Sequence, residues 1–172
     1  MKFYGQAELA LSGDKMSVDS PLVCVGKVPF GKGVFATQDI PAGTDLGEVQ
    51  GKVIDDPDYS SPYCIDLGSR YSLEPRAPYR YLNHCCSPNC QLMTHETVCE
   101  DGTPGPREVR VEALIDISGD VELTIDYQWS ATGAIRCLCG SQACRGWIVA
   151  EEELAAFLQS NTRQRRSRTL AK

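Results

Sequence analysis

The sequence predicts a mostly β fold that ends in one short helix. Fifteen glycines and ten prolines interrupt a chain of 172 residues so often that long helices have little room. From residue 22 onward, short apolar runs alternate with turn-forming residues, as in brief strands. The pattern changes near residue 150, where apolar residues recur at helical spacing.

The first strands follow a segment without a clear period. We expect residues 1–21 to form an N-terminal arm. The apolar runs at residues 23–25 and 34–36 are predicted strands, and glycine- and proline-rich turns at 29–33 and 41–43 end them. Residues 101–106 are predicted to be a surface loop between two later strands.

Residues 36–46 and 113–123 resemble each other. In both segments an aspartate stands seven residues before a leucine, as Asp39 and Leu46 and as Asp116 and Leu123. We interpret the similarity as a strand-turn-strand unit used twice, with a chance match as the alternative.

The predicted helix covers residues 150–160 and should pack back on the body. Three glutamates suit the positive end of the helix dipole, and three apolar side chains share one face: Glu151, Glu152, Glu153, Leu154, Phe157 and Leu158. Residues 161–172 carry five basic residues and no acid. Because this tail has little to bury, we expect it to be solvated and disordered, with nucleic-acid contact as the less favoured alternative.

The charge is distributed unevenly. The chain has a net charge of -6, but residues 1–160 hold 12 basic and 23 acidic residues, a balance of -11. An acidic body repels nucleic-acid phosphates and attracts cationic partners, so a basic polypeptide is a better candidate substrate than DNA. Simple solubility is the alternative explanation of the acids.

The sequence also bounds the compartment. No stretch approaches the roughly 18 consecutive apolar residues that span a bilayer, and the first 14 residues lack the apolar core of a secretory signal. We expect an intracellular protein without membrane contact, in the nucleus if the source is eukaryotic and otherwise in the cytoplasm or delivered to a host. Nine cysteines in a reducing compartment favour metal binding or free thiols over disulfides.

A C-x-C-x4-C array near the C-terminus is the strongest local signal for a metal. Three thiolates this close can face one ion, and Zn²⁺ takes four tetrahedral ligands. The fourth must come from elsewhere, and the segment NHCCSPNC at residues 83–90 is the richest supply. The candidate thiols are Cys137, Cys139 and Cys144 in the array, with Cys85, Cys86 or Cys90 as the fourth. Unpaired core cysteines are the alternative.

Gly31, Gly33 and Ala36 formally match the G-x-G-x-x-A dinucleotide fingerprint. That motif opens a helix, but here a Pro-Ala-Gly turn follows within a few residues. We instead interpret the glycines as positions where the backbone can approach a ligand or a neighbouring strand, with turn geometry alone as the alternative. The chain has two histidines, and it has neither G-x-S-x-G nor H-E-x-x-H, which argues against common hydrolases and metalloproteases.

Four segments, taken in order, resemble the SET-domain protein lysine methyltransferases that carry a post-SET zinc module. They are FGKGVFA at residues 30–36, RYLNHCCSPN at 80–89, ELTIDY at 122–127 and the cysteine array. Their order and spacing agree across residues 22–149. The resemblance implies a β-clip of short curved strands with knot-like threading, built as a SET domain over 22–131 and a post-SET module over 132–149.

The resemblance also implies roles for individual residues. Tyr127 would be the catalytic tyrosine. A cofactor site for S-adenosylmethionine (SAM) would use Gly31, Lys32, Gly33, Arg80, Asn83, His84 and Leu138. A structural Zn²⁺ would bind Cys86, Cys137, Cys139 and Cys144. The implied substrate is a lysine of a basic protein tail such as a histone's.

The chemistry of lysine methylation fits these residue types. A lysine ammonium has a reference pKa of about 10.4 and must lose a proton before it attacks a methyl group. An apolar, aromatic channel disfavours the charged form and lowers the lysine pKa. Tyr63, Tyr71 and Trp129 are candidates to line that channel, with an ordinary core aromatic as the favoured alternative for any single one of them.

Three positions depart from the family pattern. Cys85 replaces the usual serine after Asn-His, which should leave that loop intact. Val49 stands where many members have a tyrosine, which removes a possible channel hydroxyl. Ile125 lies two residues before Tyr127, where a family Phe or Tyr limits methylation, so we expect room for higher-order methylation.

Two alternatives to a histone methyltransferase stay open at this point. One is a SET-like, zinc-stabilised interaction module without turnover, which recruits a partner through an acidic groove and the basic tail. The other is a methyltransferase that acts on a non-histone protein.

Overall fold

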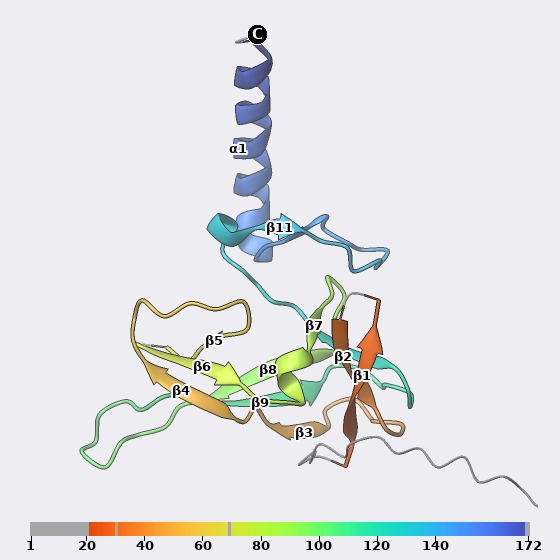
Figure 1. Ribbon diagram of the computed structural model, residues 1–172, viewed down its shortest axis with the longest axis vertical. Coiled ribbons are helices and arrows are strands. Elements are labelled where there is room, and N and C mark those ends of the chain that lie inside the picture. The colour runs from red at the N-terminus through yellow and green to blue at the C-terminus, as the bar shows by residue number, and fades with distance from the viewer. Residues whose placement is uncertain (1–20, 30, 69, 171–172) are drawn as a thin grey trace, which may run out of the picture.

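The computed structural model describes residues 21–29, 31–68 and 70–170, with side chains described up to residue 161. Within these ranges most elements are short strands in four small sheets, and one α-helix follows them (Figure 1). The predicted mostly β class is confirmed. The predicted N-terminal arm lies outside the described residues except for residue 21.

A four-stranded sheet joins distant parts of the sequence in the order β1-β2-β10-β7. Its strands are β1 (Val23–Val28), β2 (Gly31–Ala36), β10 (Glu122–Ile125) and β7 (Asn83–His84). The β1 and β2 strands form an antiparallel hairpin, and β10 pairs antiparallel with β2 but parallel with β7. The β2 glycines and the Asn-His pair therefore lie on either side of β10.

Two three-stranded sheets, a two-stranded ribbon and two 3₁₀ turns complete the body. One sheet has the order β3-β9-β8, and the other has the order β4-β6-β5. Their strands are β3 (Asp45–Glu48), β9 (Glu108–Ala113), β8 (Cys90–His95), β4 (Gly51–Asp55), β6 (Tyr71–Pro75) and β5 (Ile65–Asp66). The ribbon pairs β11 (Ile135–Arg136) with β12 (Trp147–Ile148), and the 3₁₀ turns are η1 (Tyr79–Tyr81) and η2 (Ala131–Gly133).

The core lies where these sheets face each other. Val34 of β2, Leu46 of β3, Val111 of β9 and Leu123 of β10 are almost fully buried. Alternate residues of β9 point inward, as expected for a strand with one buried face. Tyr127 packs against the edge of this core and is only partly buried, so the core places it at a boundary with solvent.

The two similar segments seen in the sequence pair with each other. Ile40 and Ile117 exchange backbone hydrogen bonds of 2.7 and 2.8 Å. The Asp39 carboxylate accepts the Gly119 N–H, and the Asp116 carboxylate accepts the Ala42 N–H, at 2.9 and 2.8 Å. The repeated aspartate thus caps the turn of the opposite copy, which supports a unit used twice.

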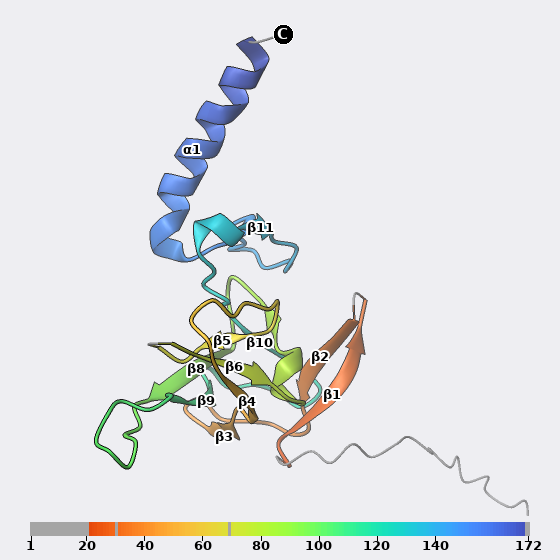
Figure 2. The same ribbon diagram turned by 60° about the vertical axis from the view of Figure 1, so that its left-hand side comes forward.

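The C-terminal helix is longer and less packed than predicted. α1 runs Glu151–Leu170, so the backbone of most of the tail expected to be disordered is helical. Residues 161–170 contain no glycine or proline, and their arginines and glutamine favour a helix. Figures 1 and 2 show α1 projecting away from the three larger sheets, so the prediction that it packs back on the body holds only for its first turns.

The first turns of α1 contact the segment just before the helix. The Glu153 carboxylate accepts the Ala131 N–H at 2.8 Å, and the Phe157 ring meets Trp147 edge-on at 4.9 Å. The helix therefore belongs structurally to the ribbon and its neighbouring loop.

Candidate active site and metal centre

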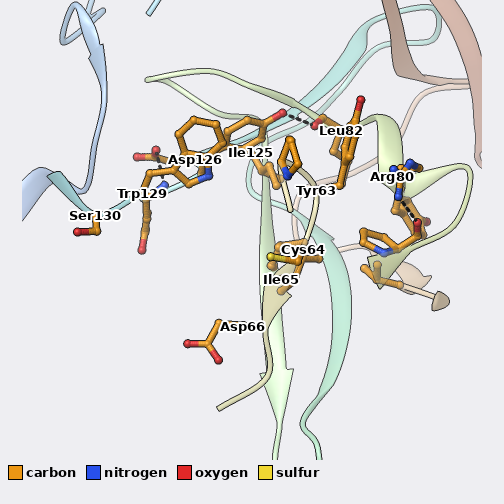
Figure 3. A pocket seen from close by; sticks show the side chains of 17 residues that line it. Tyr63, Cys64, Ile65, Asp66, Arg80, Leu82, Ile125, Asp126, Trp129 and Ser130 are labelled. Carbon is orange, nitrogen blue, oxygen red and sulfur yellow. Dashed lines mark hydrogen bonds between the residues drawn. The ribbon is translucent and has the colours of Figure 1, made fainter. Parts of the chain in front are cut away.

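A cavity of ≈ 330 Å³ lies beside the end of β10, with aromatic side chains in its wall (Figure 3). Of the predicted site residues, five line it: Tyr63, Arg80, Ile125, Tyr127 and Trp129. Its other lining residues are Val49, Pro62, Cys64, Ile65, Asp66, Pro75, Tyr79, Leu82, Leu92, Asp126, Gln128 and Ser130. These lining residues come from five separate parts of the chain, residues 49, 62–66, 75–82, 92 and 125–130, which the fold brings together.

Tyr71 is the predicted channel residue that does not line this cavity. It begins β6 and packs, partly buried, against the core. Because side chains alternate along a strand, Tyr71 shares a face with the buried Leu73 and Pro75. Tyr71 is therefore an ordinary core aromatic rather than a channel residue.

Tyr127 is held in the cavity wall by its neighbours on three sides. Its hydroxyl donates to the Leu82 carbonyl at 2.9 Å, and its N–H donates to His84 Nδ1 at 3.3 Å. Its ring stacks on Trp129 with centroids 5.3 Å apart. Burial raises the pKa of the Tyr127 phenol, so the hydroxyl stays neutral and keeps lone pairs that can accept a hydrogen bond.

Arg80 and Tyr63 form one side of the cavity, and Glu74 organises both. The Arg80 guanidinium stacks over the Tyr63 ring at 3.9 Å and pairs with the Glu74 carboxylate. Glu74 also accepts the hydroxyls of Ser61 and Tyr59 at 2.6 and 3.1 Å. Hydrogen bonds from Ser61 and Arg80 lower the pKa of Glu74, which is therefore the charged acceptor for the loop that carries Tyr63.

Replacing Glu74 by alanine should loosen this loop. Three donors lose their shared acceptor, so we expect chymotrypsin to cleave after Tyr59 about five- to tenfold faster than in the parent chain. Glu74→Gln keeps an acceptor oxygen and should give an intermediate rate. Equal cleavage rates in all three proteins would show that Glu74 does not hold the loop.

The predicted cofactor residues of β2 and β7 meet across β10. The Asn83 amide donates to the Lys32 carbonyl at 3.0 Å and to Glu122 Oε1 at 2.7 Å. A Cβ on Gly33 would lie 2.5 Å from that same Glu122 oxygen, so a side chain here would displace the carboxylate that Asn83 binds. Gly31 has a φ of 143°, which favours glycine, and a Cβ there would enter open space. The start of β2 therefore leaves room for a ligand against its backbone.

Two predicted cofactor residues, Arg80 and Leu138, lie apart from the residues of β2 and β7. Arg80 faces the Tyr63 side of the cavity rather than the β2 glycines. The Leu138 side chain is 85% exposed in the cysteine loop. Neither residue contacts the β2 group through a described interaction, so the structure brings together Gly31, Lys32, Gly33, Asn83 and His84.

Four thiols converge beside the Asn83 segment. The Sγ atoms of Cys86, Cys137, Cys139 and Cys144 all lie within 4.8 Å of one another, and those of Cys86 and Cys137 are 3.7 Å apart. Zn–S bonds of about 2.3 Å in a tetrahedron place sulfurs about 3.8 Å apart, so the donor set fits zinc. Of the three candidates for a fourth ligand, the structure selects Cys86.

Backbone N–H groups surround the cluster and favour the thiolate form at Cys139. The N–H groups of Cys139, Arg145 and Gly146 donate to Cys137, Cys86 and Cys144, each at 3.4 Å. Burial raises the pKa of the Cys139 thiol, but backbone N–H groups and the neighbouring thiols outweigh it and lower the pKa to about 6. Burial also raises the pKa of the Cys86 and Cys137 thiols, which a bound metal would deprotonate.

An ion pair connects this cluster to the tyrosine motif. Arg145 Nη1 and Nη2 lie 2.6 and 2.7 Å from the two Asp126 oxygens. Burial raises the pKa of Asp126, but hydrogen bonds from Arg145 and the Gln128 N–H more than offset it, so the carboxylate stays charged. Burial lowers the pKa of His84, and Arg145 adds to this while Asp126 opposes it.

Sequence reasoning missed several of these residues. Glu74 and Asp126 were not identified, although Asp126 stands directly before Tyr127 in the ELTIDY segment. Arg145 directly follows the last cysteine of the C-x-C-x4-C array but received no role. No spacing rule links a carboxylate at 126 to an arginine at 145, and only the fold shows that they meet.

Comparison with known proteins identifies the family. The family model for the SET domain matches residues 31–128, which is more than half of the chain. The chain belongs to the SET-domain family. The family assignment thus confirms the resemblance seen in the sequence motifs.

The curated relatives are histone methyltransferases that this chain matches only in part. A "Histone-lysine N-methyltransferase, H3 lysine-4 specific" of Emericella nidulans is 40% identical over 73 residues, covering 40% of this chain and 6% of the relative. "Histone-lysine N-methyltransferase ASHH1" of Arabidopsis thaliana is 28% identical, covering 74% and 28%. A "Histone-lysine N-methyltransferase, H3 lysine-36 specific" of Mus musculus is 28% identical, covering 80% and 6%. The chain therefore spans a small share of these relatives' length.

Solved structures share the fold. KRYPTONITE in complex with mCHG DNA and SAH has a TM-score of 0.58 at 23% identity, covering 71% of this chain and 27% of that one. KRYPTONITE with mCHH DNA, an H3(1-15) peptide and SAH has a TM-score of 0.56 at 24% identity, covering 71% and 28%. This supports the SET-type β architecture predicted from sequence. Among the described residues, no helix combines the length and the apolarity needed to cross a bilayer.

Proposed function

We propose that this chain is a SAM-dependent protein lysine N-methyltransferase that acts on a lysine in a basic protein tail. The observation that carries the proposal is the Tyr127 hydroxyl in the wall of an aromatic cavity. Tyr127 follows the last residue of β10 by two positions, and β10 pairs with β2 on one side and with β7 on the other. The family of the chain and its histone-methylating relatives support the same reaction.

The cavity suits an uncharged amine. Tyr63, Tyr127 and Trp129 surround it with aromatic surface, and Ile125 and Leu82 add aliphatic surface. Such a wall disfavours an ammonium relative to water, so the substrate lysine loses its proton more readily there. Ring faces still attract a methylated ammonium by cation–π contact, which keeps the product aligned.

Tyr127 would orient the amine. Because its O–H is already donated to the Leu82 carbonyl, the phenol oxygen offers its lone pairs to an amine N–H. That hydrogen bond would leave the nitrogen lone pair directed away from the ring and toward the β2 side. The contribution of the chain is then mainly positioning.

The β2–β10–β7 junction would hold SAM, which supplies an activated methyl group on a sulfonium. The open space beside Gly31 would take the ligand against the β2 backbone, and the acidic body suits a cationic cofactor. Asn83 would keep the Lys32 backbone in place by its hydrogen bond to the Lys32 carbonyl. The His84 ring of β7 lies 5.4 Å from that of Tyr127, centroid to centroid.

The four-thiol cluster would hold a structural Zn²⁺ in a post-SET module. The four thiols leave no open position for a reactant, as in structural zinc sites. The ion would fix the segment that carries Leu138 and Trp147 beside the junction. Histone tails are the proposed substrate and the nucleus the proposed compartment, because the relatives are histone methyltransferases and the body is acidic.

Ile125 should permit more than one methyl group. It lines the cavity in the position two before Tyr127, and an aliphatic side chain leaves more space than an aromatic ring. We expect di- and trimethylated lysine at exhaustive turnover, and Ile125→Phe should shift the product to monomethyl lysine. Intact-mass spectrometry of a histone peptide measures both, and a product limited to monomethyl lysine in the parent chain would reject the expectation.

The proposal is tested by methyl transfer with the full chain. Labelled SAM is incubated with mixed core histones, and label on a histone supports the proposal. Calorimetry with SAM distinguishes the alternative of an interaction module without turnover, which the loss of a channel hydroxyl at Val49 favours. Zinc-loaded protein that neither binds SAM nor transfers label would establish that alternative, and label on a non-histone protein alone would exclude histones as the substrate.

A further inference from the structure

The Arg145–Asp126 pair is more buried and better aligned than an ordinary surface ion pair. The two side chains are 12% and 16% exposed, and both Nη groups donate to the carboxylate in a fork-to-fork arrangement. By contrast, Arg70 and Asp55 pair at 59% and 55% exposure. A bidentate pair with little solvent fixes the orientation of both partners, and removing one partner leaves a buried charge.

One end of this pair is tied to the four-thiol cluster. Arg145 directly follows Cys144, and its N–H donates to the Cys86 Sγ at 3.4 Å. Two of the four thiols therefore contact or adjoin the Arg145 backbone. An ion that gathers these thiols also sets the position from which the guanidinium reaches Asp126.

The other end is tied to Tyr127. Asp126 is its neighbour in the chain, and Asp126 Oδ1 lies 3.5 Å from His84 Nδ1. The same His84 nitrogen accepts the Tyr127 N–H at 3.3 Å. On its far side, His84 Nε2 lies 3.3 Å from the Cys86 Sγ. Two paths of contacts therefore lead from the Tyr127 backbone to the cluster, one through Asp126 and Arg145 and the other through His84.

From this arrangement we propose that Arg145 is a positioning residue that couples the metal cluster to Tyr127. By clamping Asp126, Arg145 fixes the backbone from which the Tyr127 hydroxyl enters the cavity. The C-terminal segment would then act on the reaction through this ion pair, in addition to any cover it gives to the cofactor. The kinetic part of this proposal rests on the proposed function, because it assigns a role in the reaction to Tyr127. The structural part, that Arg145 fixes the position of Tyr127, does not depend on it.

The kinetic test compares Arg145→Met, Asp126→Asn and the double variant in the full, zinc-loaded chain. Each single change should lower kcat by about 10- to 100-fold, because small misplacements of a reacting group are that costly, while the KM for SAM changes little. The double variant should be no worse than the worse single variant, as for two residues that act as a unit. Arg145→Lys should recover part of kcat, and Arg70→Met is the matched control with unchanged kcat.

Zinc content and Trp129 fluorescence separate positioning from loss of structure. Trp129 stacks on Tyr127, so in a Trp147→Phe background its emission reports the Tyr127 position. We expect one zinc per chain and an altered Trp129 emission in Arg145→Met. Full zinc with unchanged emission and kcat within twofold of the parent would overturn the proposal. If the parent chain transferred no methyl group, the proposed function would be refuted. The comparison of Trp129 emission would still test whether Arg145 sets the position of Tyr127.

Discussion

Tyr127→Phe is expected to abolish methyl transfer, with kcat lower by about 100-fold or more. The substitution keeps the ring, its stacking on Trp129 and its contact with His84, and removes the hydroxyl that donates to the Leu82 carbonyl at the cavity wall. Without the phenol oxygen, the amine loses the acceptor that orients its lone pair. Initial rates with labelled SAM and a histone peptide measure the loss, and calorimetry should show that SAM affinity is kept.

Tyr71→Phe provides the matched control for this experiment. It removes the same hydroxyl from a tyrosine that packs against the core and lies outside the lining of the cavity. Its turnover should stay within about twofold of the parent chain. If both variants retained activity, Tyr127 would not be the residue that orients the substrate amine.

Loss of the metal should have the second large effect, because the cysteine loop at residues 138–146 contains no fully buried side chain that would hold it in place. Structural zinc contributes about 10–16 kcal/mol of apparent binding free energy in small zinc modules at neutral pH. Chelation, or Cys139→Ser, is expected to unfold this segment and weaken SAM binding. Trp147 reports the change, since its ring contacts Arg136 at 4.2 Å and Phe157 at 4.9 Å.

Cys99→Ser is the control for the cysteine change. Cys99 is an exposed thiol outside the four-thiol cluster, in the loop between β8 and β9. It should leave one zinc per chain and an unchanged Trp147 emission. A Cys139→Ser chain that still bound one zinc, or a chelated parent chain with unaltered emission and SAM affinity, would contradict the assigned metal site.

Local sequence patterns predicted what depends on local chemistry. Glycine and proline breaks gave short strands, and the cysteine spacing gave a metal site with one ligand left open. The repeated Asp-to-Leu spacing corresponded to two segments that cap each other through Asp39 and Asp116. Neighbours within a few residues decide the strand breaks and the cysteine spacing, whereas the two capping contacts join residues that are far apart in the sequence.

Contacts between distant residues were not predictable in the same way. Tyr71 was expected in the channel because it is aromatic, but the strand register turns it toward the core. Residues 161–170 were expected to be disordered because they are basic and have no apolar face. They contain no helix-breaking residue, so α1 continues through them. Glu74 and Arg145 gave no local signal, since each acts on residues that only the fold brings near.

The most direct measurement of the central claim follows the methyl group itself. The full, zinc-loaded chain is incubated with core histones and SAM that carries a deuterated methyl group, and the histone peptides are sequenced by mass spectrometry. The account predicts deuterated methyl groups on lysine Nζ, with a di- or trimethylated form, and their loss in Tyr127→Phe. Deuterium on another residue type, or on lysine to the same extent in Tyr127→Phe, would contradict it.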